Sequence, residues 1–188
     1  MAFLDLFRNR TQDVVDPKVL VCSLDSAFEA ELVHDSDTYK QYFQSVTVQR
    51  FADADELLNS LRAEYDIVHV LAAVTPDGYL GYGRIAGTEL IERSTNWGTK
   101  LLWIASDNDP DGYIKNFKPN GNKLNLVMTI QRRGEHFPSF LNRLLIEMRS
   151  GASMPVAWGR IVPQIPGQEH PDAPDTIFFA GLGQVRFT

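Results

Sequence analysis

The sequence of 188 residues contains a single cysteine, Cys22, so no disulfide can form within the chain. Cys22 lies inside an apolar run, where we expect it to pack as a small hydrophobic residue. A chain that uses no disulfides suits a reducing compartment, and the sequence therefore predicts a cytoplasmic protein.

Long hydrophobic runs are also missing. No segment approaches the roughly 20 apolar residues of a membrane-spanning helix, so we expect no stable membrane insertion. Residues 1–10, MAFLDLFRNR, lack the basic start and long apolar core of a signal peptide. They form a short amphipathic segment that we expect to dock on a partner or on its own domain. We interpret residues 1–17 as this segment followed by a linker.

The sequence also lacks an excess of positive charge. Lys and Arg number 18 against 24 Asp and Glu, and the net charge of −6 argues against a nucleic-acid partner. The content of 44% hydrophobic and 22% charged residues is typical of a soluble globular protein. We therefore predict one domain over residues 18–188, large enough to bury about 70% of its unfolded surface.

Two apolar runs dominate the chain, Ile67–Ala73 (IVHVLAA) and Leu101–Ala105 (LLWIA), and turn residues follow each one. Such runs are typical of strands buried on both faces of a parallel sheet. Open α/β sheets place their sites in the loops after the carboxyl ends of the strands. We therefore expect any site in the loops that follow these two strands.

Strand-like and helix-like segments alternate along the chain, which predicts a three-layer α/β/α sandwich with a mostly parallel central sheet. Strands are predicted at 18–23, 45–51, 67–73, 99–105 and 124–130, with a C-terminal hairpin or edge strands at 176–180 and 184–187. Helices are predicted from 25, with an interruption at 35–37, and at 53–65, 88–94, 137–149 and after Pro155. The glycines between 78 and 87 predict a flexible loop.

Ser106 and Asp107 follow the second apolar run and invite comparison with hydrolases. A serine nucleophile needs a general base, normally a histidine held by a carboxylate. The four histidines are His34, His69, His136 and His170, and none has a spacing that marks it as that base. His69 lies within a predicted strand, which favours a packed, hydrogen-bonded core histidine.

Other site chemistries have weaker signals. The acidic stretch 107–112, DNDPDG, lacks the spacing and the final glutamate of an EF-hand, so we expect an acidic turn and no metal. The glycine-rich stretch 78–87 contains no phosphate-binding motif, and we expect no cofactor. The acids Asp25, Asp66 and Asp77 leave open a receiver-like or nucleotide-sensing switch.

The two runs resemble the strands that carry the catalytic residues in CHAT peptidase domains, which are caspase-like proteins of bacteria. In that family a histidine follows an earlier histidine by four residues and precedes a glycine; the next strand ends in alanine-cysteine. Here His69 matches the earlier histidine, but Ala73 and Val74 replace the histidine-glycine pair. Ala105 matches the alanine, and Ser106 stands in the place of the nucleophilic cysteine.

Segments nearer the C-terminus are similar to the family as well. They are Phe140–Leu145, the G-x-S-x-x-x-A pattern at 151–157, and Phe178–Gly181. The resemblance implies a caspase-like fold from Lys18 onward. It also implies a catalytically inactive member, because Ala73 supplies no imidazole and Ser106 no thiolate.

The main hypothesis is therefore a pseudo-peptidase that acts as an interaction, scaffold or regulatory module in a bacterial signalling or defence assembly. The first alternative is a hydrolase that uses Ser106 with Asp107 or Asp109 and with His136 or His170. The second is the receiver-like switch. We expect protein partners, and a homo-oligomer stays open. Candidate contact residues are the loop aromatics, expected near the carboxyl ends of the strands: Tyr79, Tyr82, Trp97 and Tyr113.

Overall fold

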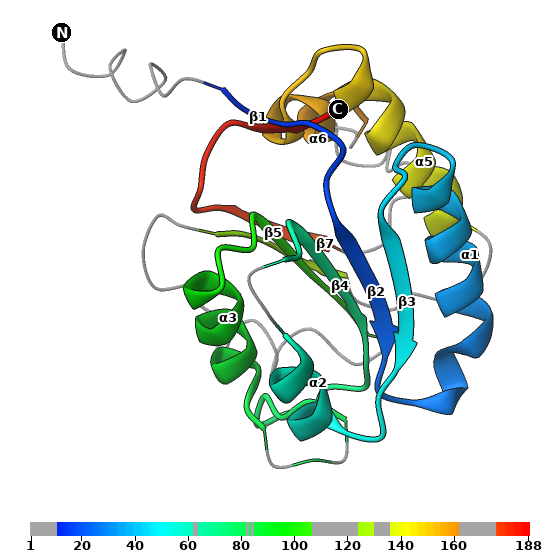
Figure 1. The fold of residues 1–188 in the computed structure, drawn as a ribbon, viewed down its shortest axis with the longest axis vertical. Coiled ribbons are helices and arrows are strands. Elements are labelled where there is room, and N and C mark those ends of the chain that lie inside the picture. Colours follow the sequence, from blue (N-terminus) through cyan, green and yellow to red (C-terminus); the bar gives the residue numbers. More distant parts are fainter. Residues whose placement is uncertain are drawn as a thin grey trace, which may run out of the picture.

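A six-stranded, mostly parallel sheet forms the middle of the protein (Figure 1). The computed structural model describes residues 11–61, 64–81, 83, 85–106, 124–129, 136–161 and 176–188. The strands of the sheet are β2 (Val19–Ser23), β3 (Val46–Arg50), β4 (Ile67–Leu71), β5 (Leu101–Ala105), β6 (Asn125–Thr129) and β7 (Thr176–Ala180). Their order is β3-β2-β4-β5-β6-β7, and only β7 runs antiparallel to its neighbour.

Helices cover both faces of this sheet, which confirms the predicted three-layer α/β/α architecture. The helices are the 3-10 turn η2 (Ser26–Phe28) and α1 (Glu29–Lys40), α2 (Ala54–Ser60), α3 (Gly87–Asn96), α5 (His136–Arg149) and α6 (Met154–Ile161). One core lies between the sheet and α1, α5 and α6, and a second lies under α2 and α3 (Figure 1). Each helix therefore buries one stripe against the sheet.

The central strands are apolar throughout because both of their faces are covered. All five residues of β4 and all five of β5 are buried. Successive side chains of a strand point to opposite faces. Ile67 and Leu71 accordingly belong to the core under α1, and Val68 and Val70 to the core under α2.

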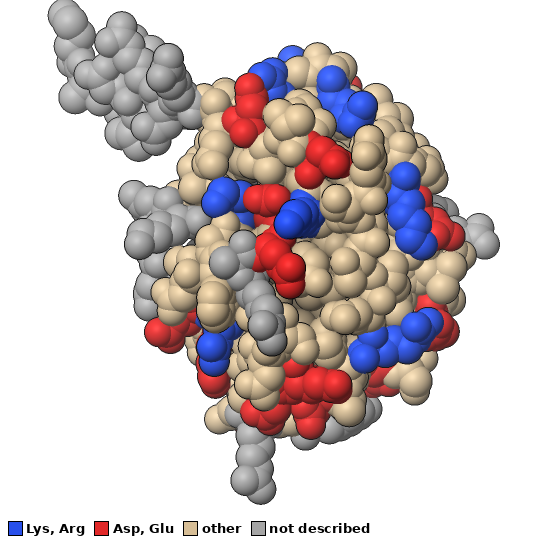
Figure 2. Space-filling model, viewed as in Figure 1, with Lys and Arg blue, Asp and Glu red and all other residues tan. Residues whose placement is uncertain are grey.

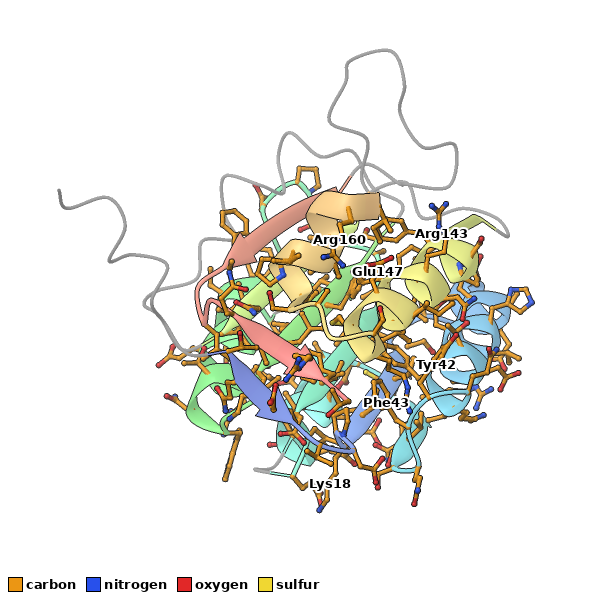
Figure 3. All side chains as sticks on the ribbon, turned by 90° about the horizontal axis from the view of Figure 1, so that it is seen from above. Lys18, Tyr42, Phe43, Arg143, Glu147 and Arg160 are labelled. Atoms are coloured by element: carbon orange, nitrogen blue, oxygen red, sulfur yellow. The ribbon has the colours of Figure 1, made fainter. Side chains whose placement is uncertain are left out.

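Polar contacts join α1, α5 and α6, the helices that cover one face of the sheet. The Tyr42 hydroxyl, just after α1, donates a hydrogen bond to Asn142 on α5. Arg160 on α6 donates to Glu147 on α5 over 2.9 Å. Figure 3 shows these side chains from above, with Tyr42 beside Phe43 and Arg160 beside Glu147. The described part of the chain contains no helix with the length and apolar character needed to cross a membrane.

Two helix boundaries differ from the prediction. The expected interruption at 35–37 is wrong, because α1 continues from Glu29 to Lys40. Asp35 and Ser36 are buried on its inner side, and the Ser36 hydroxyl donates to the Val33 carbonyl over 3.0 Å. Helix α2 begins as predicted at the Asp53 cap but ends at Ser60, well before 65, because the next residue has an extended backbone.

The two ends of the described chain pair with each other. β1 (Gln12–Val14) and β8 (Val185–Phe187) form a separate parallel two-stranded sheet. Residues 11–17, predicted as a linker, therefore contain a strand. The predicted C-terminal hairpin is also wrong, although β7 is an edge strand as the alternative expected. β8 leaves the large sheet because its two apolar side chains, Val185 and Phe187, are fully buried in the core shared with α5 and α6.

Candidate functional site

Ala73 and Ser106 lie at the same edge of the sheet, where β4 and β5 end. The register pairs Leu71 with Ala105, and the Ala72 amide donates to the Ala105 carbonyl over 3.0 Å. The two positions therefore follow neighbouring parallel strands. This is the edge at which α/β proteins bind ligands and hold their catalytic groups.

Ser106 is buried at this edge, with only 1% of the residue exposed. A serine nucleophile has to reach the carbonyl or phosphoryl group of a substrate that arrives from solvent. In this conformation the Ser106 hydroxyl presents almost no surface to such a substrate. Ser23, the last residue of β2 on the other side of β4, is buried to a similar degree, at 3%. Ser23 and Ser106 thus both belong to the packed interior.

The segment after β4 folds back over the sheet edge as a small hairpin. Bridges join Val74 to Leu80 and Tyr79 to Ala86. The Gly81 amide donates to the Ala73 carbonyl over 2.6 Å. Gly81 has a φ of +61°, a backbone conformation that favours glycine. The described residues of this predicted loop thus form hydrogen-bonded turns, one of which bonds to the carbonyl of Ala73.

This hairpin also closes the switch point of the sheet. The strand order reverses between β2 and β4, and α/β sheets commonly open a crevice there. Here the Leu24 amide donates to the Leu71 carbonyl over 2.9 Å, and the Leu24 side chain is buried. A Cβ added to Gly81 would lie 3.9 Å from Cβ of Leu24. The chain itself therefore occupies the place where a crevice would open.

His69 lies on β4 and points toward α1, with no exposed surface. The Tyr39 hydroxyl lies 3.3 Å from Nδ1 of His69. Oδ2 of Asp35 lies 3.4 Å from Nε2 of the same ring. The Trp103 ring stacks on the imidazole, with centroids 5.4 Å apart and planes 8° from parallel. His69 is thus the packed core histidine that the sequence predicted.

The geometry favours one arrangement of protons in this cluster. Burial, together with the nearby Asp35 charge, raises the pKa of Tyr39 well above its ordinary value. Tyr39 therefore keeps its proton and can donate it to Nδ1, which leaves the Nε2 proton facing the Asp35 carboxylate. Because the cluster is closed to solvent, its role is to hold α1 against the sheet.

Sequence reasoning missed Asp35 and Tyr39 as the partners of His69. A signal for them existed in the spacing of α1. Leu32, Asp35 and Tyr39 are separated by three and four residues, so they lie on one helix face. An acid on an otherwise apolar face indicates a buried polar partner. The interpretation of residues 35–37 as a break in the helix concealed this pattern.

The aromatic candidates separate into different regions. Tyr79 lies on the hairpin at the carboxyl edge and is 40% exposed. Trp97, 39% exposed, caps the end of α3 at the opposite edge, so its predicted place near the carboxyl ends is wrong. After α3 the chain enters the amino end of β5. There the Lys100 amide donates to the carbonyl of Asp66, which lies just before β4. Tyr82 and Tyr113 lie outside the described residues.

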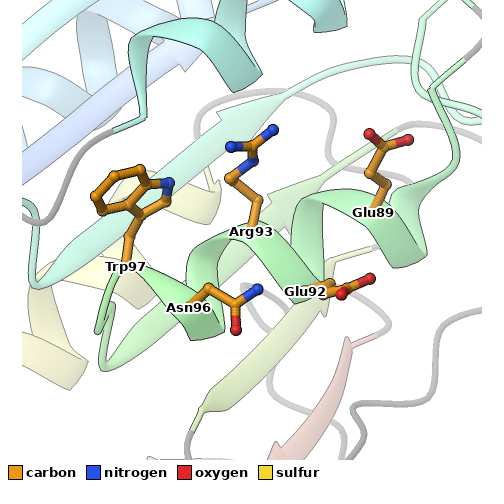
Figure 4. A pocket seen from close by; sticks show the side chains of 5 residues that line it. All are labelled: Glu89, Glu92, Arg93, Asn96 and Trp97. Carbon is orange, nitrogen blue, oxygen red and sulfur yellow. The ribbon is translucent and has the colours of Figure 1, made fainter.

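A hollow of about 370 Å³ lies beside Trp97 on the outer side of α3 (Figure 4). Both acidic and basic side chains line it, together with the indole ring. The described lining residues are Glu89, Glu92, Arg93, Asn96 and Trp97. Figure 4 shows that all five project from the same helix, which makes the hollow an open surface depression.

Several predicted residues fall outside this geometry. Asp107, Asp109 and His170 lie outside the described residues, and so does the side chain of His136. Asp25 accepts a hydrogen bond from the Ala27 amide over 2.9 Å as the cap of η2. Asp77 is exposed in the turn of the hairpin.

Charges of both signs are mixed on the surface. On the face shown in Figure 2, basic and acidic side chains lie interspersed. One pair joins Arg50 to Glu29, and the hydrogen bond from Arg50 lowers the pKa of Glu29. Within the described residues, no three His, Cys, Asp or Glu side chains come together as a potential metal site.

No family model matches this sequence, and no curated protein matches it in a sequence search. The fold is similar to the crystal structure of drICE, a caspase, with a TM-score of 0.53 and 11% sequence identity. The alignment covers 95% of this chain and 92% of drICE. At this level of identity the likeness shows the fold alone, and this chain has a caspase-like fold.

Proposed function

We propose that this chain is a catalytically inactive, CHAT-like pseudo-peptidase domain that acts through binding. Its role is that of an interaction, scaffold or regulatory module in a bacterial signalling or defence assembly. The caspase-like fold supports the relation to peptidase domains. The residues at 69–74 and 105–106 support the relation to CHAT domains, and the wider biological context comes from that resemblance.

The burial of Ser106 is the observation that carries the proposal. A caspase-like dyad needs an accessible thiolate and an imidazole at the edge where β4 and β5 end. At those positions this chain has a serine that is 1% exposed and Ala73, whose methyl group can neither donate nor accept a proton. The only cysteine, Cys22, is fully buried within β2. Burial raises the pKa of its thiol, which keeps it protonated and unreactive.

The hairpin after β4 supports a binding role for this edge. Main-chain hydrogen bonds hold it, from the Gly81 amide to the Ala73 carbonyl and from the Thr75 amide to the Tyr79 carbonyl, and the Tyr79 amide donates to the Thr75 hydroxyl. Tyr79 stands on this fixed support with 40% of its surface exposed. A rigid, partly exposed tyrosine is typical of protein interfaces, since it contributes contact area and one hydrogen bond with little loss of entropy.

A turnover assay tests the absence of catalysis. Purified wild type and Ser106→Ala would be incubated with unfolded proteins, peptides and activated esters, and new amino termini and released alcohols measured. Ser23→Ala is the matched control, because Ser23 is a buried serine that ends a neighbouring strand at the same edge. We expect no turnover from any of the three. Hydrolysis by wild type and Ser23→Ala that Ser106→Ala loses would overturn the proposal and favour the hydrolase alternative.

A binding assay tests the proposed binding role. Tagged wild type, Tyr79→Ala and Trp97→Ala would be recovered from bacterial cells, and the protein bound in stoichiometric amount quantified by mass spectrometry. The two aromatics are equally exposed but lie at opposite edges of the sheet, so Trp97→Ala is the matched control. We expect Tyr79→Ala alone to weaken binding, by roughly the tenfold or more typical of an interface aromatic. Equal recovery by all three proteins would contradict the proposed surface.

A further inference from the structure

The strand β1 pairs with β8 through main-chain hydrogen bonds, as a bound peptide strand would. Its main chain bonds to β8 and the residues next to it: Gln12 donates to the Gln184 carbonyl over 2.8 Å, and Thr188 donates to the Val14 carbonyl over 3.0 Å. β8 is anchored by fully buried side chains, whereas Gln12 and Asp13 of β1 are exposed and Val14 is half-buried. The site on β8 therefore belongs to the core, and its occupant β1 adds only the half-buried Val14 to that core.

One side-chain contact specifies this occupant. Nε and Nη2 of Arg186 donate to the two carboxylate oxygens of Asp13, each over 2.8 Å. The third donor, Nη1, binds the Gly151 carbonyl over 3.0 Å and so orients the guanidinium. Two parallel hydrogen bonds between Arg and a carboxylate are geometrically selective. The β8 edge therefore selects an extended segment with an acid at its middle position.

The connection from β1 to β2 is short and strained. Asp16 has a φ of +45°, the only positive φ of a non-glycine residue in the described chain. It also precedes Pro17, and a residue before proline is sterically confined to extended conformations. Hydrogen bonds hold Asp16 in this turn, from its own amide to the Thr188 carbonyl and from the Gln44 amide to its carboxylate. Next to it, Val15 leaves 78% of its surface exposed.

We propose that β1 is an exchangeable strand, and that two copies of this chain dimerise by placing each β1 on the β8 of the other copy. Every contact between β1 and β8 is kept in such a dimer. The connection opens, so that Asp16 adopts the extended conformation that Pro17 favours. The two Val15 side chains can then become buried against each other. Short connections under strain are the usual origin of strand exchange.

We expect the fraction of dimer to increase with protein concentration. At low concentration, β1 of the same chain occupies β8, because its effective concentration there is high. Charge reversal separates the two arrangements. Asp13→Arg places two cations at the contact within one chain, and Arg186→Asp places two acids there. Neither variant can form the ion pair by itself. In an exchanged mixed dimer, both contacts join opposite charges.

The experiment is to mix Asp13→Arg and Arg186→Asp and to measure mass by light scattering and native mass spectrometry. We expect a one-to-one mixed dimer from the mixture and monomers from each variant alone. The control carries both changes in one chain, which restores the pair internally and should behave as wild type does. A mixture that stays monomeric, or variants that dimerise equally well alone, would overturn the proposal.

A second measurement covers the case in which a charge reversal prevents folding. Asp13→Cys and Arg186→Cys chains would be mixed and oxidised, and the disulfide located by mass spectrometry. These positions are register partners, so a bond between them in two chains requires β1 of one copy on β8 of the other. Glu147→Cys, also in a surface ion pair, replaces Arg186→Cys in the control. Equal cross-linking to position 147 would refute the exchange.

Discussion

The buried contact between Asp35 and His69 yields the sharpest prediction for stability. We consider three variants: Asp35→Leu, His69→Leu and the two changes combined. Each single change removes one side of a contact in which neither residue has any exposed surface, and the combined variant removes both. The removal of one partner from a buried polar pair generally costs more than the replacement of both by apolar groups of similar volume.

The magnitude follows from the state of the pair. A neutral imidazole N–H faces a buried carboxylate over 3.4 Å, so the contact is a buried polar pair in which one member is charged. His69→Leu removes the imidazole that faces a buried carboxylate, and we expect it to lower the free energy of unfolding by about 3–5 kcal/mol. Asp35→Leu leaves an imidazole that can stay neutral, so its cost is smaller, about 1–3 kcal/mol. The double variant should cost less than the sum, by about 1–3 kcal/mol.

Urea denaturation followed by far-ultraviolet circular dichroism measures these differences. Dichroism is preferable to fluorescence here, because Trp103 stacks on His69 and would report the substitution itself. Val70→Ala is the control, since Val70 follows His69 on β4 but faces the other core. Its cost should add to that of Asp35→Leu within about 0.5 kcal/mol. Full additivity of Asp35→Leu and His69→Leu would show that the two side chains do not interact.

Three further predictions concern the helix cap, the thiol and the strand β1. Asp53→Ala removes the carboxylate that caps α2 over 2.8 Å and should cost about 1 kcal/mol in thermal unfolding, whereas Asp55→Ala in the same turn should cost almost nothing. Cys22 should react with a thiol reagent only as fast as the protein unfolds, because it is fully buried; rapid reaction in the native state would contradict this. The hydrogen bond from Arg186 lowers the pKa of Asp13, so this pair supports β1 fully above about pH 4 and its support is lost as the pH falls through that lowered pKa. The protection of the β1 amides from hydrogen exchange, measured against the intrinsic exchange rate at each pH, should therefore fall in acid, and unchanged protection would count against the role of the pair.

The sheet was predictable because burial on both faces leaves a direct trace in the sequence. Runs such as Leu101–Ala105 are apolar at every position and bounded by turn residues, which is typical of a short strand buried on both faces. The caps of the helices were also readable, as Asp53 shows. Local chemistry decides these features, so local sequence contains them.

The errors arose where a distant segment decides the structure. Residues 12–14 look like a linker, because their strand exists only through pairing with β8 more than 170 positions away. Asp35 looks like a helix breaker, because its partner His69 lies on another element. In both places a polar residue finds its partner through the tertiary fold, and no local pattern contains that partner.

The sequence correctly placed Ala73 and Ser106 together at one edge of the sheet, but the accessibility of Ser106 was not predictable. The order of the strands follows from handedness and connection rules, which place the ends of β4 and β5 together. Whether Ser106 faces solvent depends on how neighbouring segments cover that edge. The hairpin held by Gly81 is one such segment, and its cover is a property of the folded chain.

The most direct test of the central claim is whether Ser106 reacts as a nucleophile. Native protein would be incubated with a fluorophosphonate, which forms a covalent bond only with an activated serine, and its intact mass and labelled peptide determined. We expect no adduct on Ser106 at any pH at which the protein stays folded. A stoichiometric adduct on Ser106 that Ser106→Ala abolishes and Ser23→Ala retains would show an active, accessible nucleophile and contradict the proposed absence of catalysis.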